Sequence, residues 1–413
     1  MSRATARTLK AEGEFAPLHF TGMNIYTDGF KMRGGEDAAF SSLAIDQIRA
    51  DLSLGRWRER VWQVDHVEAQ RVELRVDGSR IALAPEQAAP AARGSGAFAG
   101  WLPNRVEIAT AAVRDANLFW GNEASGAGSV RRVNVAATQD AGAWDILANG
   151  GRIEQGSLPG LDLTSAHLVF RAPSLFVQSA ELRQGATGSV SVAGEVRFDD
   201  EVDLHAKLAG IDLAPFLNDD WRVRLHGRAS GEVRVQGPLP SRNAPVVSGS
   251  MQIADGQIEA LPMLDEIATF THLDQYRRLT LSRASADFRQ ENGTLRATNF
   301  IIESSGLMRI EGGFTVVNGT IDGAFRVGVS PKSVDWMPGA REHVFTEAAG
   351  GYVWTPMRLS GPLAKPGEDL SPRLAAAAKD AAVEKVESTV KGAVETGKSV
   401  IKSALDTLMP LFK

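Results

Sequence analysis

The alternation that decides the fold is clearest in residues 189–213, which run SVSVAGEVRFDDEVDLHAKLAGIDL. Successive side chains of a β-strand point to opposite faces, so a period of two indicates a half-buried strand. Two such runs flank the turn-like pair Asp199-Asp200. Their apolar positions are Val190, Val192, Val196 and Phe198 in the first run and Val202, Leu204, Ala206 and Leu208 in the second. The stretch therefore predicts a β-hairpin with one dry and one wet face.

The same design returns in residues 307–331, LMRIEGGFTVVNGTIDGAFRVGVSP. Asn318-Gly319 is a strong hairpin signal, because both residue types tolerate the positive φ of a two-residue turn. Gly312 interrupts the apolar run where Gly194 interrupts the first one. The apolar positions are Met308, Ile310, Phe314 and Val316 before the turn and Ile321, Phe325, Val327 and Val329 after it. We interpret the stretches as related units; two ordinary hairpins that look alike are the alternative, since period two is generic.

Short alternating strands between Gly-rich and Pro-rich turns fill most of the remaining chain, and helices are the exception. Pro262 at a first helical turn, followed by apolar residues at helical spacing, predicts a short helix near 262–275. An apolar stripe near the helical period predicts a long amphipathic helix over 374–412. Its stripe suits a membrane surface or packing against a partner helix or the sheet edge. The side chains expected to make that contact are Val386, Val390, Ile401, Leu405 and Leu408.

Three Pro-rich and Gly-rich seams divide the chain. The longest is APEQAAPAARGSGAFAGWLP at residues 84–103, which has little periodicity and suits a flexible connector. The expected organisation is N-terminal strands over 1–83, a connector over 84–104, a central β segment over 105–236, a C-terminal β segment over 246–360 and the helix over 374–412.

Composition excludes several classes of function. The chain has 413 residues, of which 43% are hydrophobic and 23% charged, so it is expected to fold rather than stay disordered. A net charge of -5 without a long basic run argues against nucleic acid as a partner. The chain has no cysteine, and its seven histidines lack the spacing that places two ligands on one helix face. We therefore expect no metal and no cofactor.

Catalytic motifs are missing as well. GRASG at residues 227–231 does not match a nucleophile elbow, and GSGAFAG at residues 94–100 lacks the Lys-Ser/Thr of a phosphate loop. Adjacent acids such as Asp199 and Asp200 point to opposite faces of a strand and do not easily converge on a bond. The protein is therefore expected not to be an enzyme. No stretch approaches the length of a transmembrane span, and the first eleven residues lack the apolar core of a secretory signal.

A sheet with one apolar face must bury that face against something. The chain offers few helices to cover so many strands. Either the sheet folds onto itself as a sandwich or barrel, or it forms an open trough whose inner face shelters a ligand with an apolar body. The residues alone leave both arrangements open.

Two parts of the sequence resemble the AsmA-like proteins of Gram-negative envelopes, which are relatives of TamB and are grouped with bridge-like lipid-transfer proteins. The N-terminal part is FSSLAIDQIRADLSLGRWRERVWQVDHVEAQRVELRVDG, residues 40–78, with a second copy of its strand type in VEIATAAVRDANLFWG, residues 106–121. The C-terminal part is similar to the family's C-terminal region. It comprises SGEVRVQGPL at residues 230–239, GSMQIADGQIEALPMLDEIATFT at 249–271 and FRQENGTLRATNFIIESSGLMRIEGGFTVVNGTIDG at 288–323.

The resemblance implies a fold and a function, and it carries no catalytic residue. The implied fold is a mainly β, elongated, twisted and largely antiparallel sheet curled into an open groove. The implied function is transport of phospholipid, or outer-membrane biogenesis, by a periplasmic protein associated with the inner membrane. The family's N-terminal anchor helix is absent from this sequence. The expected partners are a phospholipid or other acyl-chain lipid, a membrane surface and envelope proteins.

The side chains expected to line the groove come from the two hairpins. They are Val190, Val192, Val196, Phe198, Leu204, Leu208, Met308, Ile310, Phe314, Val316, Phe325 and Val327. The alternative function is a structural β-scaffold without lipid cargo, and the third is a carbohydrate-active enzyme.

Overall fold

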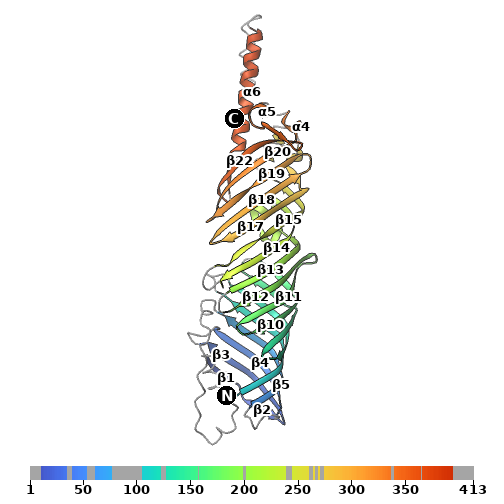
Figure 1. Ribbon diagram of the computed structural model, residues 1–413, viewed down its shortest axis with the longest axis vertical. Helices are drawn as coiled ribbons and strands as arrows, with labels where there is room; N and C mark the ends of the chain where they lie inside the picture. Colours follow the sequence, from blue (N-terminus) through green and yellow to red (C-terminus); the bar gives the residue numbers. More distant parts are fainter. Residues whose placement is uncertain are drawn as a thin grey trace. The chain divides into compact units, whose positions relative to one another are not determined.

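The protein is described from a computed structural model. It covers residues 11–34, 40–53, 61–76, 105–121, 127–156, 158–198, 201–238, 244–259, 264–265, 268–269, 274–335, 339–363 and 365–393. These residues are mainly β: 23 strands form one sheet, and among the described strand pairs only the one between β5 and β6 is parallel (Figure 1). The mainly β, largely antiparallel fold predicted from the alternation is confirmed.

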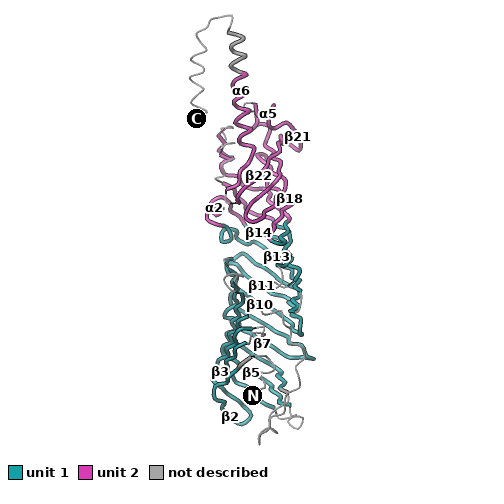
Figure 2. Tube along the Cα trace, turned by 90° about the vertical axis from the view of Figure 1, so that its left-hand side faces the viewer, with its two compact units in different colours: residues 1–217, 228–251, 288–292 teal, residues 218–227, 252–287, 293–413 magenta. Residues whose placement is uncertain are grey.

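The chain divides into two compact units, which Figure 2 colours separately. Unit 1 comprises residues 1–217, 228–251 and 288–292, and unit 2 comprises residues 218–227, 252–287 and 293–413.

The first half of the chain contains β1 (Ala11–Phe15), β2 (Leu18–Thr21), β3 (Asn24–Gly34), β4 (Ser42–Ser53), β5 (Val61–Val76), β6 (Arg105–Trp120), β7 (Gly128–Asp140), β8 (Ala143–Asn149), β9 (Arg152–Gln155), β10 (Leu158–Arg171), β11 (Ser174–Gln184), β12 (Gly188–Arg197), β13 (Glu201–Asp212) and the 3-10 turn η3 (Ala214–Phe216). The middle of the chain contains α2 (Asp219–Arg222), β14 (Leu225–Pro238), β15 (Val246–Glu259), the 3-10 turn η4 (Asp274–Tyr276), β16 (Arg278–Thr280), β17 (Arg283–Glu291) and β18 (Thr294–Ser304). The last part contains β19 (Met308–Val317), β20 (Thr320–Val329), α4 (Pro331–Val334), α5 (Ala340–His343), β21 (Glu347–Ala349), β22 (Tyr352–Pro362), β23 (Gly367–Glu368) and α6 (Leu370–Ala393).

From β3 to β14 the strands of unit 1 follow one another in chain order, except that β8 and β9 both lie between β7 and β10. Strands β1 and β2 both pair with β3. Figure 1 shows β10, β11, β12 and β13 side by side, and the registers join each of these strands to the next through an antiparallel ladder. The ladder between β5 and β6 is parallel, unlike the antiparallel ladders around it. A parallel pair cannot be joined by a tight turn, because the chain must first return to the end where the strand began. Residues 77–104, which include the predicted connector, lie outside the described residues.

Both predicted hairpins are confirmed. Strands β12 and β13 pair with Val190 opposite Leu208, and β19 and β20 pair with Ile310 opposite Val327. Asn318 and Gly319 have φ of 47° and 74°, as the Asn-Gly turn requires. Asp199 and Asp200 lie outside the described residues.

Gly194 and Gly312 occupy equivalent places in these hairpins. Their φ angles are 143° and 156°, a region that side chains disfavour. A Cβ on Gly194 would collide with the carbonyl oxygen of Asp203, and one on Gly312 with that of Ala324. Glycine is therefore needed at both positions for the neighbouring backbone to approach so closely.

The C-terminal helix α6 begins before its predicted start at residue 374. Glu368 precedes it and accepts hydrogen bonds from the backbone N–H groups of Leu370 (2.5 Å) and Ser371 (2.9 Å), which have no partner inside the helix. Val386 and Val390 lie within α6, but their side chains are outside the described residues, as are Ile401, Leu405 and Leu408. None of the helices in the described residues has the length and apolar character needed to span a membrane.

The short helix predicted near 262–275 is described only in part. Leu264, Asp265, Ala268 and Thr269 are helical, and the Thr269 hydroxyl donates to the Asp265 carbonyl oxygen at 2.7 Å. The turn η4 follows. The remaining residues of this range lie outside the description.

Candidate functional site

A continuous row of apolar side chains crosses unit 1 at right angles to its strands. In each ladder the residue of the row lies opposite its neighbour on the next strand, so the row follows from the registers alone. From β3 to β14, omitting β9, its members are Thr27, Ile48, Ala69, Val113, Val135, Ala148, Ala166, Ala180, Val192, Ala206 and Val233. We call this set the apolar row and the side of the sheet that carries it the inner face.

The apolar row is long and carries no charge. Eleven strands are separated by ten steps of about 4.8 Å each, so the row extends about 48 Å along the sheet. Its one polar member is Thr27, whose hydroxyl donates to the backbone carbonyl oxygen of Ala16 at 3.1 Å. Within unit 1 the inner face therefore offers an apolar path that no ionised side chain interrupts.

Much of the inner face of unit 1 remains in contact with solvent. Ala69, Ala148 and Ala166 are buried, whereas Ala180 and Ala206 are half-buried. Val113, Val135 and Val192 are half-buried. In the described residues of this unit the only helical segment is η3, with three residues, so no helix covers the row. A row of valines left half-buried provides contact area for an apolar ligand.

Residues of the first hairpin that were predicted to line a groove share this inner face. The register places Val190, Val192 and Val196 opposite Leu208, Ala206 and Val202, and Leu204 lies opposite Gly194. Val190 is buried, whereas Val192, Val196, Leu204 and Leu208 are half-buried and Phe198 is 40% exposed.

Residues of the second hairpin lie in a different environment. Met308, Phe325 and Val327 belong to the closed core of unit 2, where Val327 is 0% exposed. Ile310 and Phe314 pack against this core, and Val316 is half-buried. We call the side of the unit 2 strands that carries Met308, Phe325 and Val327 the inner face of unit 2. Protein fills it around these three side chains, which are closed to a ligand in this conformation.

Helix α6 supplies part of that filling. Leu370, Leu374 and Ala377 are buried in the core of unit 2, and α6 lies against β22 and α5 (Figure 2). Arg373 fastens the helix to β22 by donating to the Thr355 hydroxyl at 2.6 Å and the Pro356 carbonyl oxygen at 2.7 Å. Sequence reasoning missed these contacts, although positions 370, 374 and 377 have the spacing of one helix face.

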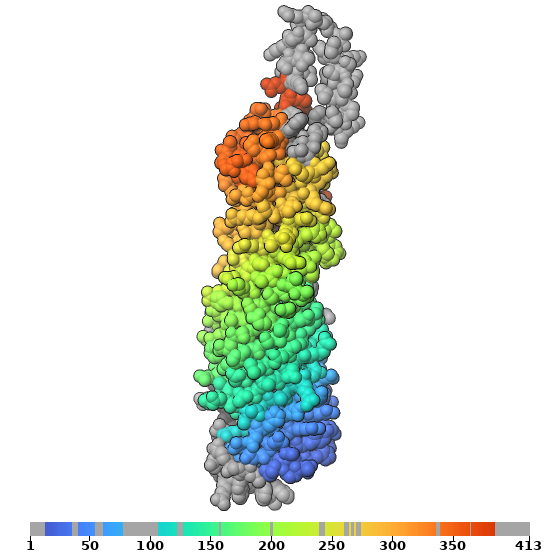
Figure 3. Space-filling view, turned by 90° about the vertical axis from the view of Figure 1, so that its right-hand side faces the viewer, coloured from blue at the N-terminus to red at the C-terminus, as the bar shows by residue number. Residues whose placement is uncertain are grey.

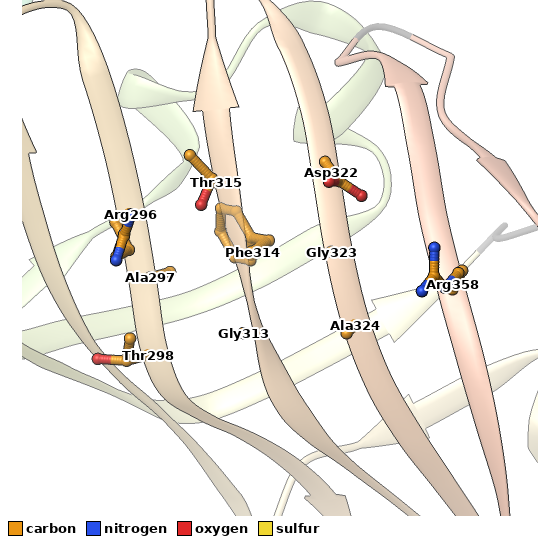
Figure 4. Close-up of a pocket in the computed structure, with 10 residues that line it drawn as sticks. All are labelled: Arg296, Ala297, Thr298, Gly313, Phe314, Thr315, Asp322, Gly323, Ala324 and Arg358. Carbon is orange, nitrogen blue, oxygen red and sulfur yellow. The ribbon is translucent and has the colours of Figure 1, made fainter.

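The opposite side of the sheet, the outer face, carries charged side chains such as Asp203 and Glu311 together with exposed apolar ones such as Leu147 and Val317. Figure 3 shows one side of unit 1 as adjoining bands of colour in chain order, so the strands themselves form this surface. In unit 2 a hollow of about 340 Å³ lies over β18, β19, β20 and β22, with Arg296, Thr298, Asp322 and Arg358 around it (Figure 4). It is walled by both signs of charge and is separated from the inner face by the sheet.

Glu311 joins two arginines on the outer face of unit 2. It accepts hydrogen bonds from Nε of Arg326 at 2.7 Å and Nε of Arg309 at 2.6 Å. Burial alone would raise the pKa of the Glu311 carboxyl, but the hydrogen bonds from Arg326 and Arg309 outweigh burial and hold the pKa below its ordinary value.

The contribution of Glu311 to stability is expected to depend on pH. A carboxyl group whose pKa is lowered by folding stabilises the protein above its unfolded pKa, and this stabilisation is lost as pH falls through the folded pKa. We therefore expect Glu311→Gln to destabilise the protein most near neutral pH and progressively less below pH 4.5, the ordinary value. Urea unfolding of both proteins across this range measures the effect. A penalty that stays constant with pH would contradict it.

Among the described residues, no three His, Cys, Asp or Glu side chains are grouped closely enough to hold a metal ion. The chain was also compared with family models, with curated proteins and with solved structures, and nothing in the three sets matches it. The AsmA-like resemblance therefore stays a prediction.

Proposed function

We propose that the protein shields the acyl chains of a phospholipid, or of another acyl-chain lipid, along the inner face of unit 1, while the headgroup stays in water. The observation that carries the proposal is the uncharged apolar row, which crosses eleven strands without a helix over it in the described residues. In this view the sheet of unit 1 forms an open groove, and the lipid replaces the second protein layer.

Shielding acyl chains from water is energetically favourable. Each methylene removed from water contributes about 0.8 kcal/mol, so a groove that covers even part of two acyl chains offsets much of the cost of carrying a lipid through water. A buried charge would cancel this gain, because an unpaired ion in an apolar environment costs several kcal/mol. The apolar row offers contact area to the methylenes and carries no charge, so it satisfies both conditions.

We further propose that the protein is an AsmA-like factor that works in the periplasm in association with the inner membrane. Lipid transport or outer-membrane biogenesis would then be its task, and it would act without catalysis. Separation of periplasm, inner membrane and outer membrane from the source cells, followed by immunodetection, tests the location. Detection in the cytoplasm would refute it.

Lipid content of the purified protein tests the central proposal. The full chain is purified from cells and analysed by native mass spectrometry and by lipid extraction. We expect copurified phospholipid in reproducible stoichiometry. A protein that is reproducibly free of lipid, and that takes up none from phospholipid vesicles, would refute the proposal.

A charge placed in the apolar row should abolish lipid binding. Val192 is half-buried and faces inward between Ala180 and Ala206. We expect Val192→Glu to lower the bound lipid at least about tenfold, because the new carboxylate loses its hydration when an acyl chain covers it. Retention of lipid is measured by extraction from the purified variant.

The neighbouring residue provides a matched control. Ala193 is exposed and points to the opposite face of the same strand. Ala193→Glu adds the same charge one position away and should leave lipid binding unchanged. Equal lipid loss in both variants would show that the effect is one of charge or folding and not of the inner face.

A scaffold without lipid cargo is the second candidate, and one observation favours it. The inner face of unit 2 is filled by α4, α5 and α6, as a purely structural sheet would require. If protein also covered the inner face of unit 1, no room would remain there for lipid. The vesicle experiment above separates the two functions.

A further inference from the structure

The inner face of unit 1 has two long rims, where successive strands turn. Because neighbouring strands are antiparallel, alternate turns fall on opposite rims. The turns at residues 141–142 and 172–173 and the one that joins β12 to β13 lie on one side. The turn at residues 185–187 and the connection that follows β13 lie on the other. We call the first the aromatic rim and the second the closed rim.

The closed rim is sealed by side chains and by the chain itself. Leu163, Leu182, Val190 and Ile211 lie beside it and are all buried in one cluster. After β13 the chain turns back, so that η3 lies against β10, three strands away, and Leu213 packs against the same cluster. An acyl chain crossing this rim would first have to displace packed protein.

The aromatic rim is more open. Four apolar side chains follow one another across it, in register, and all are half-buried: Trp144, Phe170, Leu175 and Val196. Phe198 stands one step beyond Val196 on the same face and is 40% exposed. Its ring meets that of Phe170 edge-to-face, with centroids 6.2 Å apart. On β13 the residue opposite Val196 is Val202, which is buried.

We propose that lipid enters and leaves the inner face of unit 1 sideways, over the aromatic rim, with Phe170 and Phe198 as the surface that an acyl chain crosses. This inference rests on the proposed function and adds its route. Exposed aromatic rings continue the apolar surface outward to solvent, so a methylene chain passing them stays in contact with apolar atoms. The closed rim also has exposed apolar side chains, Leu158 at 55% and Phe216 at 40%, but Leu163, Leu182, Val190 and Ile211, which lie between this rim and the middle of the inner face, are buried.

A charge on the rim should slow exchange without emptying the groove. Phe198→Asp is expected to lower the rate of lipid uptake about tenfold, since each chain must pass an ionised carboxylate, while the final amount bound stays near that of the unsubstituted protein. The probe is NBD-labelled phosphatidylethanolamine in vesicles of phosphatidylethanolamine and phosphatidylglycerol. Uptake by the full chain is followed by the rise in NBD fluorescence.

The control variant is Val317→Asp. Val317 is similarly exposed, at 44%, and likewise stands just before a hairpin turn, but it belongs to the outer face of unit 2. Its rate should equal that of the unsubstituted protein. An unchanged rate for Phe198→Asp, or an equal slowing by Val317→Asp, would overturn the proposed route and leave the proposed function intact.

Photo-crosslinking keeps the inference testable if Phe198→Asp does not fold. Benzoylphenylalanine in place of Phe198 should form adducts with vesicle lipid, as should the same residue in place of Val192. In place of Thr187, which is exposed on the closed rim, it should form none. Adducts at Val192 without adducts at Phe198 would overturn the route alone. If neither position forms adducts and the unsubstituted protein takes up no lipid, the proposed function fails as well.

Discussion

Gly194→Ala is expected to destabilise the protein by about 4 kcal/mol, combining the strain of an unfavourable φ with an overpacked contact. Gly194 has a φ of 143°, and its added Cβ would lie 2.9 Å from the Cα of Leu204 as well as colliding with Asp203. Relief requires β12 and β13 to separate at this point, with loss of ladder hydrogen bonds. Urea unfolding followed by circular dichroism measures the change.

Gly185→Ala is the matched control for this prediction. Gly185 also has a positive φ, 60°, but nothing lies within 4 Å of the position that its Cβ would take. Its substitution therefore carries only the cost of a left-handed conformation, about 1 kcal/mol. If the two variants lose equal stability, the close approach of β12 and β13 is not what requires glycine at residue 194.

Leu374→Ala is expected to destabilise unit 2 by about 2 to 5 kcal/mol, the usual cost of truncating a buried leucine. Leu374 lies on α6 and is buried with Met308 and Val327 in the core of unit 2. The loss weakens the attachment of α6 to the sheet, so the inner face of unit 2 should become accessible more often. Urea unfolding reports the stability, and fluorescence of the apolar dye ANS reports the exposed face.

The comparison variant lies on the same helix. Val383 is 50% exposed, so Val383→Ala removes little buried area and should change stability by less than about 0.5 kcal/mol. Similar effects of the two substitutions would mean that α6 does not cover the inner face of unit 2 in solution.

Local pattern was sufficient to predict the two hairpins and the mainly β character of the chain. The alternation of Val190 and Val192 with polar neighbours, and the Asn318-Gly319 turn, are properties of adjacent residues, and both were confirmed. The parallel ladder of β5 and β6 was beyond prediction, because no adjacent residues encode the pairing of strands separated by residues 77–104. The predicted start of α6 was too late because the apolar stripe near residue 386 does not include Leu370 and Leu374, which are buried in the core of unit 2.

Local pattern also could not predict which residues of the candidate site are accessible to a ligand. Val192 and Val327 have the same alternating surroundings in sequence, yet Val192 is half-buried on the inner face of unit 1 while Val327 is fully buried under helices. The difference arises from α4, α5 and α6, which are distant in the chain from β12. Likewise, Ala69 and Ala166 join one row only through the registers, which no periodicity within a single strand reveals.

A sheet whose hairpins follow one another in chain order can become longer or shorter by one hairpin at a time. A hairpin such as β12–β13 enters and leaves the sheet on the same rim, so duplication or loss of one hairpin preserves the orientation of every other strand. The length of the apolar row can therefore change in increments of two strands, about 10 Å, without refolding the rest. The hairpins at residues 189–213 and 307–331 share a glycine at the same place. Addition of a hairpin would let a chain of this kind match a different distance with the same local chemistry.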